Sequence, residues 1–525
     1  MCRKCGEPMR VLLLRPPRYV WPFNSETSAF WPPLGLLCLA AAVREELPEL
    51  EVLVWDAPGQ KVGWRTLAQR LAAQRIDVLG IGEETVSAHE ALRAARIVKQ
   101  LHPQCVVVAG GVYFAHAVEQ TLNEECVDVI VRGEGETTFV RVLRQVHNRR
   151  AWGAIPGLAF RGSNGELVLT PPPPLVRDLD TLPFPAYDLV NADLYGQGSR
   201  NHPGLASIEH SRGCVDSCSF CILWKHMGEY VNGNGTCRPF LRTKSAERSF
   251  DEVLWLYRRF ERRTFGWVDP TFNASPAWSD EWAERMLASN LMGPGGRPKT
   301  LHTAWVRADC VVRDESNGIL AKLVRAGLRQ VMIGVERDER AGLAALNKHN
   351  NDPEVCRKAF AIFRERYPQV YTIGTVIFGL PGDTVNDLKR LAACEDDMNM
   401  DHCFVLPLTP NPGTTTAVDA ARGGYTVNTD LSSYNFHTPV CITDTLDLRQ
   451  VESLYWRIML APSWQRVRGM LPSMLLDPDP RKRRLHRALF YRGATVAARS
   501  LLRAVLKPRE KQPARYWRKP SWYDK

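Results

Sequence analysis

The 525-residue sequence lacks any long hydrophobic run. The longest apolar stretch near its start, residues 34–43, is about half of the roughly 20 residues that a membrane-spanning helix needs. Internal repeats are absent too, and the one low-complexity tract is a run of prolines at residues 171–174. We therefore expect neither a signal peptide nor a transmembrane helix, and no repeat architecture.

The 14 cysteines lack the regular pairing of a disulfide-rich secreted domain. Cys2 and Cys5 form an isolated C-x2-C without a second pair nearby, which does not support a metal site there. Met9 directly precedes the first expected strand, so translation could start there or at Met1. With 45% hydrophobic and 24% charged residues, the composition is that of a globular protein. We expect about three domains and a cytoplasmic location.

Basic residues are concentrated in the last segment. Residues 481–525 contain fifteen Lys or Arg against two Asp or Glu, more than the net charge of +11 of the whole chain. Leucines and valines alternate with these charges, and Trp517 and Trp522 follow. The pattern fits either a solvated cap or a surface that docks at the inner face of an anionic membrane. Specific nucleic-acid binding is not expected.

The first part of the chain alternates short apolar strands with helical stretches. Such a pattern predicts a doubly wound, Rossmann-like α/β domain over residues 1–150. Glycines follow two of its strands, at Gly110, Gly111 and Gly133. Open parallel sheets bind ligands at the carboxyl ends of their strands, so a ligand is expected there, although tight turns would also need glycine.

A proline-rich linker over residues 151–195 separates this domain from a second α/β series. Six strands joined by helices predict a partial (β/α)6 barrel over residues 196–420, with chemistry at the carboxyl ends of its strands. The strand signal is then lost, and residues 421–525 are expected to form a helical C-terminal region that ends in the basic tail.

Cys214, Cys218 and Cys221 follow the first strand of that barrel. A C-x3-C-x2-C loop provides three thiolates, enough to ligate three irons of a [4Fe–4S] cluster and leave the fourth iron open to a substrate or cofactor. An alternative is a structural zinc site in which His210 completes a Cys3His set. Zinc knuckles sit in small autonomous modules, whereas this loop lies within a large α/β pattern.

The cysteine loop, with Phe220 beside its last cysteine, resembles the signature of the radical S-adenosylmethionine (SAM) enzymes. More segments, in matching order, are similar to the cobalamin-dependent subgroup, which includes radical methylases and the anaerobic magnesium-protoporphyrin monomethyl ester cyclase. These segments are Pro32 to Ala41, Trp55 to Ala57, Cys105 to Gly111, Arg132 to Thr137, Leu182 to Asp188, Asp269 to Asn273, Trp305 to Asp309, Gly334 to Glu336, Gly379 to Thr384 and Thr409 to Thr414.

The resemblance implies three cofactors: a [4Fe–4S] cluster on the three cysteines, SAM on the open iron, and cobalamin over the first sheet. The implied SAM contacts are Phe220, Asp269, Arg307, Glu336, Gly374 and Gly379. The candidate cobalamin contacts are Thr85, Ser87, Gly110, Gly111, Tyr113, Gly133 and Glu134.

Two departures from related sequences stand out. Many cobalamin domains carry the axial histidine in D-x-H-x-x-G, whereas the nearest equivalent here, Asp56-Ala-Pro-Gly59, has none. The cobalt is therefore expected to lack a histidine ligand from this loop. In the barrel, Arg337 follows Glu336 where Glu-Ser is more usual.

The implied activity is methylation of an unactivated carbon through a 5′-deoxyadenosyl radical and methylcobalamin. An alternative is an oxidative cyclase or rearrangement enzyme acting on a tetrapyrrole-like or lipid substrate, and a further one is a non-catalytic cobalamin or iron–sulfur sensor. The expected partners are a small-molecule or lipid-like substrate and an electron donor such as flavodoxin or ferredoxin.

Overall fold

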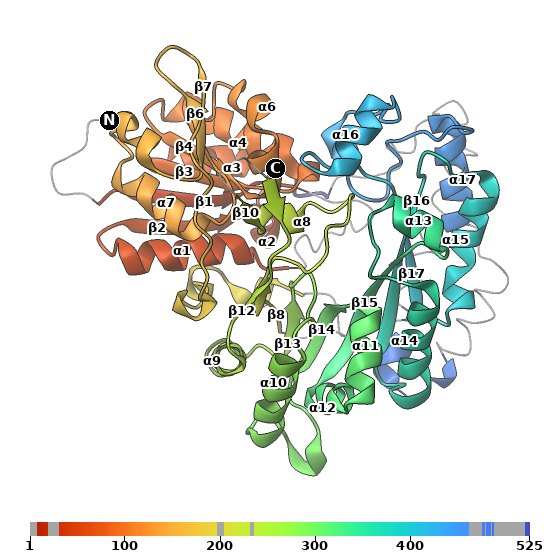
Figure 1. Ribbon diagram of the computed structural model, residues 1–525. Coiled ribbons are helices and arrows are strands. Elements are labelled where there is room, and N and C mark those ends of the chain that lie inside the picture. Colours follow the sequence, from red (N-terminus) through yellow and green to blue (C-terminus); the bar gives the residue numbers. More distant parts are fainter. Residues whose placement is uncertain are drawn as a thin grey trace.

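The computed structural model describes residues 8–18, 31–196, 204–231, 236–460, 475–477, 479–484, 486, 487 and 520–525. In this part of the chain two α/β units lie side by side, with α8 (Leu223–His226) and β10 (Glu229–Val231) between them (Figure 1). One unit is built on a seven-stranded sheet and the other on a six-stranded sheet. No helix among the described residues is long and apolar enough to cross a membrane.

The sheet of the first unit has the strand order β2-β1-β3-β4-β5-β6-β7. Its first five strands run parallel, and two antiparallel strands extend one edge. The strands are β1 (Arg10–Arg15), β2 (Glu51–Asp56), β3 (Val78–Gly82), β4 (Val106–Gly110), β5 (Val129–Val131), β6 (Leu158–Arg161) and β7 (Leu167–Leu169). The range 151–195, expected to be a linker, therefore begins with two strands of the first sheet.

Helices cover both faces of this sheet, as expected for a doubly wound fold. In β1, Val11 and Leu13 pack on one face while Leu12 and Leu14 pack on the other, and all four are fully buried. Such a continuous apolar run is typical of a parallel strand covered on both sides. One face carries α1 (Leu34–Glu46) and α7 (Gly135–Arg144), and the other carries α3 (Trp64–Ala72) and α4 (Ala88–Leu101).

The second unit is an open barrel of six parallel strands, in which each strand pairs with the next along the chain. The strands are β8 (Leu205–Ile208), β13 (Thr264–Trp267), β14 (Leu301–Val306), β15 (Leu328–Glu336), β16 (Tyr371–Phe378) and β17 (His402–Pro407). The connecting helices are α9 (Ala246–Phe260), α10 (Pro276–Ala288), α11 (Ala308–Ser316), α12 (Ile319–Ala326), α13 (Arg340–Ala345), α14 (Pro353–Arg366) and α15 (Val385–Asp397). The expected partial (β/α)6 barrel is confirmed.

After the barrel, α16 (Thr415–Arg422) is followed by a largely irregular stretch with one short 3-10 helix, η7 (Leu431–Ser433), and then by α17 (Leu448–Leu460). The described part of residues 421–525 is thus less helical than expected. Residues 488–519, with Trp517, lie outside the described residues.

The described parts of the basic tail pack on both units. Lys482 and His486 are buried, and the ammonium of Lys482 lies 2.9 Å from the Asp401 carboxylate at the start of β17. Trp522 and Tyr523 belong to the core of the first unit, where the amide of Trp64 donates to the carbonyl of Tyr523. Trp522, one of the two tryptophans expected at a membrane surface, is therefore buried inside the protein.

Candidate functional site

The three cysteines lie in the loop that follows β8 and the short strand β9 (Ser211–Arg212), which pairs with β12 (Arg242–Thr243). All three thiols are free. Gly213 directly precedes the first of them with a φ of +86°, and a Cβ there would lie 1.8 Å from the carbonyl oxygen of Phe240. Only glycine allows the chain to turn so close to its neighbour. The geometry of the loop therefore depends on Gly213 as well as on the cysteines.

Asp269, at the end of β13, holds the start of the cysteine loop. Its Oδ1 accepts hydrogen bonds from the amides of His210 (2.9 Å) and Ser211 (2.5 Å) and from the Ser211 hydroxyl (2.7 Å). Burial raises the pKa of this carboxyl to about 7, while the hydrogen bonds from Ser211 oppose the shift. Asp269 was expected among the SAM contacts, and the structure places it beneath the loop.

His210 does not join the cysteines. Its ring is fully buried among Trp267, Phe272 and Trp278, and its Nε2 lies 2.9 Å from the carbonyl oxygen of Phe272. Among the described residues no three Cys, His, Asp or Glu side chains converge on one ion position. A Cys3His zinc site would need the His210 imidazole beside the three thiolates, whereas here it is enclosed by aromatic side chains.

Side chains from the end of β14 and from the loop between α13 and α14 hold the middle of the cysteine loop. Arg307 forms an ion pair with Asp216, and the side-chain amide of Asn350 donates to the same carboxylate at 2.6 Å. The Asn347 amide donates to the carbonyl of Ser217 at 2.8 Å. Arg307, expected to contact SAM, thus braces the cluster loop, and its Nε also donates to Asp309.

The thiols fit a cluster chemically. Burial raises the pKa of Cys218 to about 12 and that of Cys221 to about 11, while backbone amides of Leu223 and Trp224 oppose the shift at Cys221. An apolar site of this kind favours thiolates only when a cation neutralises them, and bound iron would do so. The residues present therefore fit a [4Fe–4S] cluster.

Glu336 ends β15 in a left-handed conformation, with a φ of +61°. Pairing with β16 shifts register at this point, between Gly334 and Glu336. Lys348 lies against it: its Nζ is 2.8 Å from Oε1 of Glu336 and 2.8 Å from the carbonyl oxygen of Gly334. A strained acidic residue at a barrel-strand end, paired with a nearly buried lysine, is typical of a ligand site. The sequence offered no signal for Lys348.

Arg337 has a structural explanation. Its guanidinium forms two hydrogen bonds with the Asp383 carboxylate, at 2.9 and 2.7 Å, and Asp383 also accepts from the amides of Gly379 and Leu380. The departure from Glu-Ser thus stabilises the turn after β16 through a bidentate pair.

A cavity of about 710 Å³ lies at the ends of β15, β16 and β17, and none of the remaining expected SAM residues, Phe220, Gly374 and Gly379, is among its lining residues. Ser219 of the cysteine loop, Leu346, Leu380 and Leu408 line it, and Phe220 packs against the same apolar cluster. Gly379 has a φ of +88° and open space at its Cβ position, whereas a Cβ on Gly374 would strike Met400. Gly379 therefore has open space beside it and directly precedes the lining residue Leu380, while Gly374 is required for packing.

A cavity of about 700 Å³ lies between the two units. Its floor is the carboxyl edge of the first sheet, including Gly82, Gly110 and Gly133, and its roof is formed by barrel strands through residues such as Trp305 and Met332. Residues on both sides of the cysteine loop also line it: Glu209, Arg212, His226 and Met227.

Buried ion pairs join the two units at the rim of this interdomain cavity. Arg212 lies 2.7 Å from Glu136 and 3.5 Å from Glu134, and Arg242 lies 2.8 Å from Glu134. All four side chains are at least nine-tenths buried. The motif Arg132 to Thr137 therefore also fixes the first sheet to the strand that leads into the cluster loop.

The expected cobalamin contacts divide into two groups. Gly110, Gly111, Gly133 and Glu134 line the interdomain cavity. Thr85, Ser87 and Tyr113 are buried near it and are not among the lining residues.

The segment Asp56 to Gly59 does not line the cavity either, because Asp56 is buried and paired with Arg15 at 2.5 Å. The sequence from Arg15 to Pro33, which connects β1 to α1, contains no histidine. That the cobalt lacks a histidine ligand from the loop at residues 56–59 stays a prediction. The glycine-lined floor fits a flat, bulky ligand such as a corrin.

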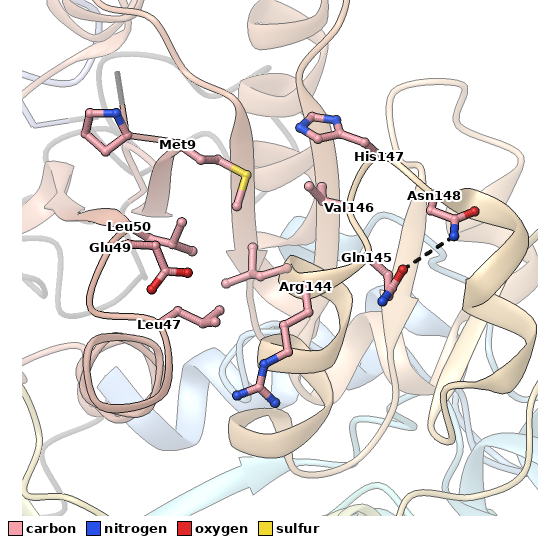
Figure 2. Close-up of a pocket in the computed structure, with 11 residues that line it drawn as sticks. Met9, Leu47, Glu49, Leu50, Arg144, Gln145, Val146, His147 and Asn148 are labelled. Atoms are coloured by element: carbon pink, nitrogen blue, oxygen red, sulfur yellow. Dashed lines mark hydrogen bonds between the residues drawn. The ribbon is translucent and has the colours of Figure 1, made fainter. Parts of the chain in front are cut away.

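A third cavity, of about 680 Å³, lies at the opposite edge of the first sheet (Figure 2). It is lined by Met9 before β1, by Leu47, Glu49 and Leu50 before β2, and by residues 143–148 at the end of α7 and beyond. Since ligands of parallel sheets bind at the carboxyl ends of the strands, this cavity is not the cofactor site.

Comparisons with known proteins match both units. Residues 22–143 match the B12 binding domain, and residues 208–394 match the Radical SAM superfamily. An uncharacterised methyltransferase of Pyrococcus horikoshii is 26% identical over 77% of this chain and 82% of its own length. The anaerobic magnesium-protoporphyrin IX monomethyl ester cyclase of Rubrivivax gelatinosus is 25% identical over 86% and 78%.

Two solved structures share the fold. The cobalamin-dependent SAM radical enzyme OxsB, with aqua-cobalamin and SAM bound, superposes with a TM-score of 0.67 at 14% identity, over 97% of this chain and 74% of that one. The radical SAM methyltransferase TsrM from Kitasatospora setae gives 0.63 at 17% identity, over 87% and 90%. A B12 binding domain and a radical SAM barrel, joined across one cavity, place this chain in the family of cobalamin-dependent radical SAM enzymes, which use a [4Fe–4S] cluster, SAM and cobalamin.

Proposed function

We propose that this protein methylates an unactivated carbon of a small-molecule substrate. The observation that carries the proposal is the interdomain cavity, which is bounded by the carboxyl edge of the B12 domain, by the barrel strands and by both flanks of the cysteine loop. A substrate carbon held there would be near both cofactors. Together the cofactors supply a hydrogen-abstracting radical and a methyl group.

The residues of this chain have mainly positioning roles. Cys214, Cys218 and Cys221 would hold the cluster, and the Asp269 and Arg307 contacts fix the loop that carries them. Glu336, Lys348 and the Gly379 turn are the groups that we assign to SAM, because Glu336 and Gly379 lie at the ends of β15 and β16 and Lys348 is paired with Glu336. Phe220 contributes an apolar wall to that site.

Ring formation on a tetrapyrrole-like or lipid substrate is the second candidate, because cyclases are among the relatives that match most of the chain. The two reactions differ in product mass. Methylation adds one methyl group, whereas oxidative cyclisation removes hydrogens. Mass spectrometry of the substrate pool in a strain lacking this protein, compared with the parent strain, would distinguish them.

Two partners complete the proposal. A flavodoxin or ferredoxin would deliver the electron that reduces the cluster. The basic tail would bring the enzyme to an anionic membrane if the substrate is lipid-like. Lys482, His486, Trp522 and Tyr523 are buried, so such contact would use other tail residues, such as the exposed Arg484. Co-sedimentation with anionic vesicles should then fall when the exposed arginines are neutralised, and unchanged binding would contradict this role.

The central test is anaerobic purification of the holoprotein with an optical spectrum and an iron count. We expect Cys221→Ala to lose the iron and the deoxyadenosine-forming activity. Cys237→Ala, which changes a nearby cysteine outside the motif, should retain both. A wild-type protein that forms product without iron would refute the proposal.

A further inference from the structure

Glu83 has an unusual position on the floor of the interdomain cavity. It follows β3 directly, lines the cavity and is only 6% exposed. One carboxylate oxygen, Oε2, lies 2.5 Å from the guanidinium of Arg18. The other, Oε1, is buried and has no hydrogen-bond partner among the described residues. An unpartnered buried carboxylate oxygen is costly and calls for a ligand or bound water.

The other charged groups of the floor are differently placed. Arg15 is paired with Asp56, Glu134 with Arg242, and Glu136 with Arg212. The neighbouring Glu84 is exposed. Oε1 of Glu134 likewise lacks a hydrogen bond, but it lies 2.8 Å from the Arg242 guanidinium. In the described part of the floor, Glu83 is therefore a buried acid with one carboxylate oxygen left without a hydrogen bond.

Glycines surround Glu83 and keep the floor flat. Gly82 precedes it, and a Cβ on Gly111, whose φ is +79°, would lie 3.4 Å from the Glu83 amide nitrogen. A planar macrocycle could therefore approach the backbone closely, with the Glu83 carboxylate as the polar group beneath it. The segment 56–59 contains no histidine, and the histidine that lines the cavity, His226, lies on α8 and not on the first sheet.

We propose that the Glu83 carboxylate faces the metal of the bound cobalamin from the sheet side, directly or through one water, and sets the charge next to the cobalt. The proposal depends on cobalamin binding and is independent of which reaction follows. Arg18 would hold the carboxylate in place and partly balance its charge. An anion in this position opposes addition of an electron to the cobalt.

The test is anaerobic redox titration of the cobalamin-loaded protein at pH 8. Burial raises the pKa of Glu83 to about 7, so most Glu83 side chains are still ionised at this higher pH. We expect Glu83→Gln to shift the Co(II)/Co(I) midpoint to a more positive potential, whereas Glu83→Asp and the exposed control Glu84→Gln should stay near wild type. An unchanged midpoint in Glu83→Gln, or an equal shift in Glu84→Gln, would overturn the proposal.

A second measurement uses the wild-type protein, so it does not depend on how the variants fold. A nitrogen ligand splits the electron paramagnetic resonance lines of cobalt(II), whereas a carboxylate or water oxygen does not. We expect no nitrogen splitting, and a clear splitting would refute the placement of Glu83. Failure of the wild type to bind cobalamin would refute the family's cofactor use here as well, whereas binding with an unshifted Glu83→Gln midpoint refutes only this proposal.

Discussion

Nη2 of Arg212 lies 2.7 Å from Oε1 of Glu136, and this ion pair connects the B12 domain to the barrel two residues before the first cluster cysteine. Glu209 lies at the same distance from the same guanidinium. Burial disfavours all these charges, but the carboxylates hold Arg212 charged, and Arg212 in turn lowers the pKa of Glu136. Buried ion pairs thus connect the cysteine loop to the first sheet, in addition to the covalent chain between them.

We predict that Arg212→Met destabilises the protein by about 3–5 kcal/mol, because it leaves buried carboxylates without their cation. Thermal unfolding should report a lower midpoint. Arg177→Ala is the matched control, since Arg177 forms an exposed pair with Glu229 and its loss should cost less than about 1 kcal/mol. Equal effects of both changes would contradict a special role of the interdomain pair.

Asp269 is predicted to control cluster retention without touching iron. Asp269→Ala removes the acceptor of three hydrogen bonds, so we expect loss of iron on purification. Asp269→Asn keeps one carbonyl oxygen in place and should retain most of the iron. An iron count and the optical spectrum distinguish the two variants. Equal iron in Asp269→Ala and wild type would show that the cysteine loop keeps its geometry without Asp269.

Stability should depend on pH through Glu83. Burial raises the pKa of Glu83 from 4.5 to about 7 in the folded protein, although Arg18 opposes the shift. The folded state therefore binds this proton more tightly than the unfolded chain, and the associated stability is lost as pH rises from about 4.5 to about 7. In the cofactor-free protein, the thermal unfolding midpoint of wild type should fall relative to that of Glu83→Gln between about pH 4.5 and 7. Above about pH 7 the difference between the two midpoints should stay constant. A constant difference from pH 4.5 to 8 would contradict the raised pKa.

The tail is predicted to stabilise the first domain. Trp522 is 6% exposed and belongs to the hydrophobic core of the first domain. Trp522→Ala should therefore lower the free energy of unfolding by about 3–5 kcal/mol. Leu476→Ala, at a side chain that is 78% exposed, is the control and should change the midpoint little. Thermal unfolding of the two variants beside wild type would test this, and an unaffected Trp522→Ala protein would mean that the tail packs only weakly.

Local patterns in the sequence predicted much of the architecture. Fully apolar segments such as residues 11–14 marked parallel strands, and the spacing of Cys214, Cys218 and Cys221 predicts a cluster loop after the first barrel strand. Glycines after strands correctly marked the edge that forms the cavity floor. These signals are visible because each depends on neighbours within a few residues.

The features that the sequence did not predict depend on contacts between residues that are far apart in the chain. Asp269 is 58 residues from the Ser211 hydroxyl that it anchors, and Arg337 is 46 residues from Asp383. Lys348 and Glu83 look like ordinary surface charges in the sequence, but in the folded protein Glu83 is buried and Lys348 is largely covered. Strands β6 and β7 were assigned to a linker because they are short and follow the last glycine turn of the first sheet.

The docked end of the chain also affects the order of assembly. The Tyr523 hydroxyl lies near the Glu90 carboxylate, 433 residues away along the chain. On the ribosome the B12 domain emerges early, yet its core stays unfilled until Trp522 and Tyr523 have been made. Cobalamin capture by a nascent chain would therefore meet an incompletely packed domain, and full loading should await synthesis of Trp522 and Tyr523.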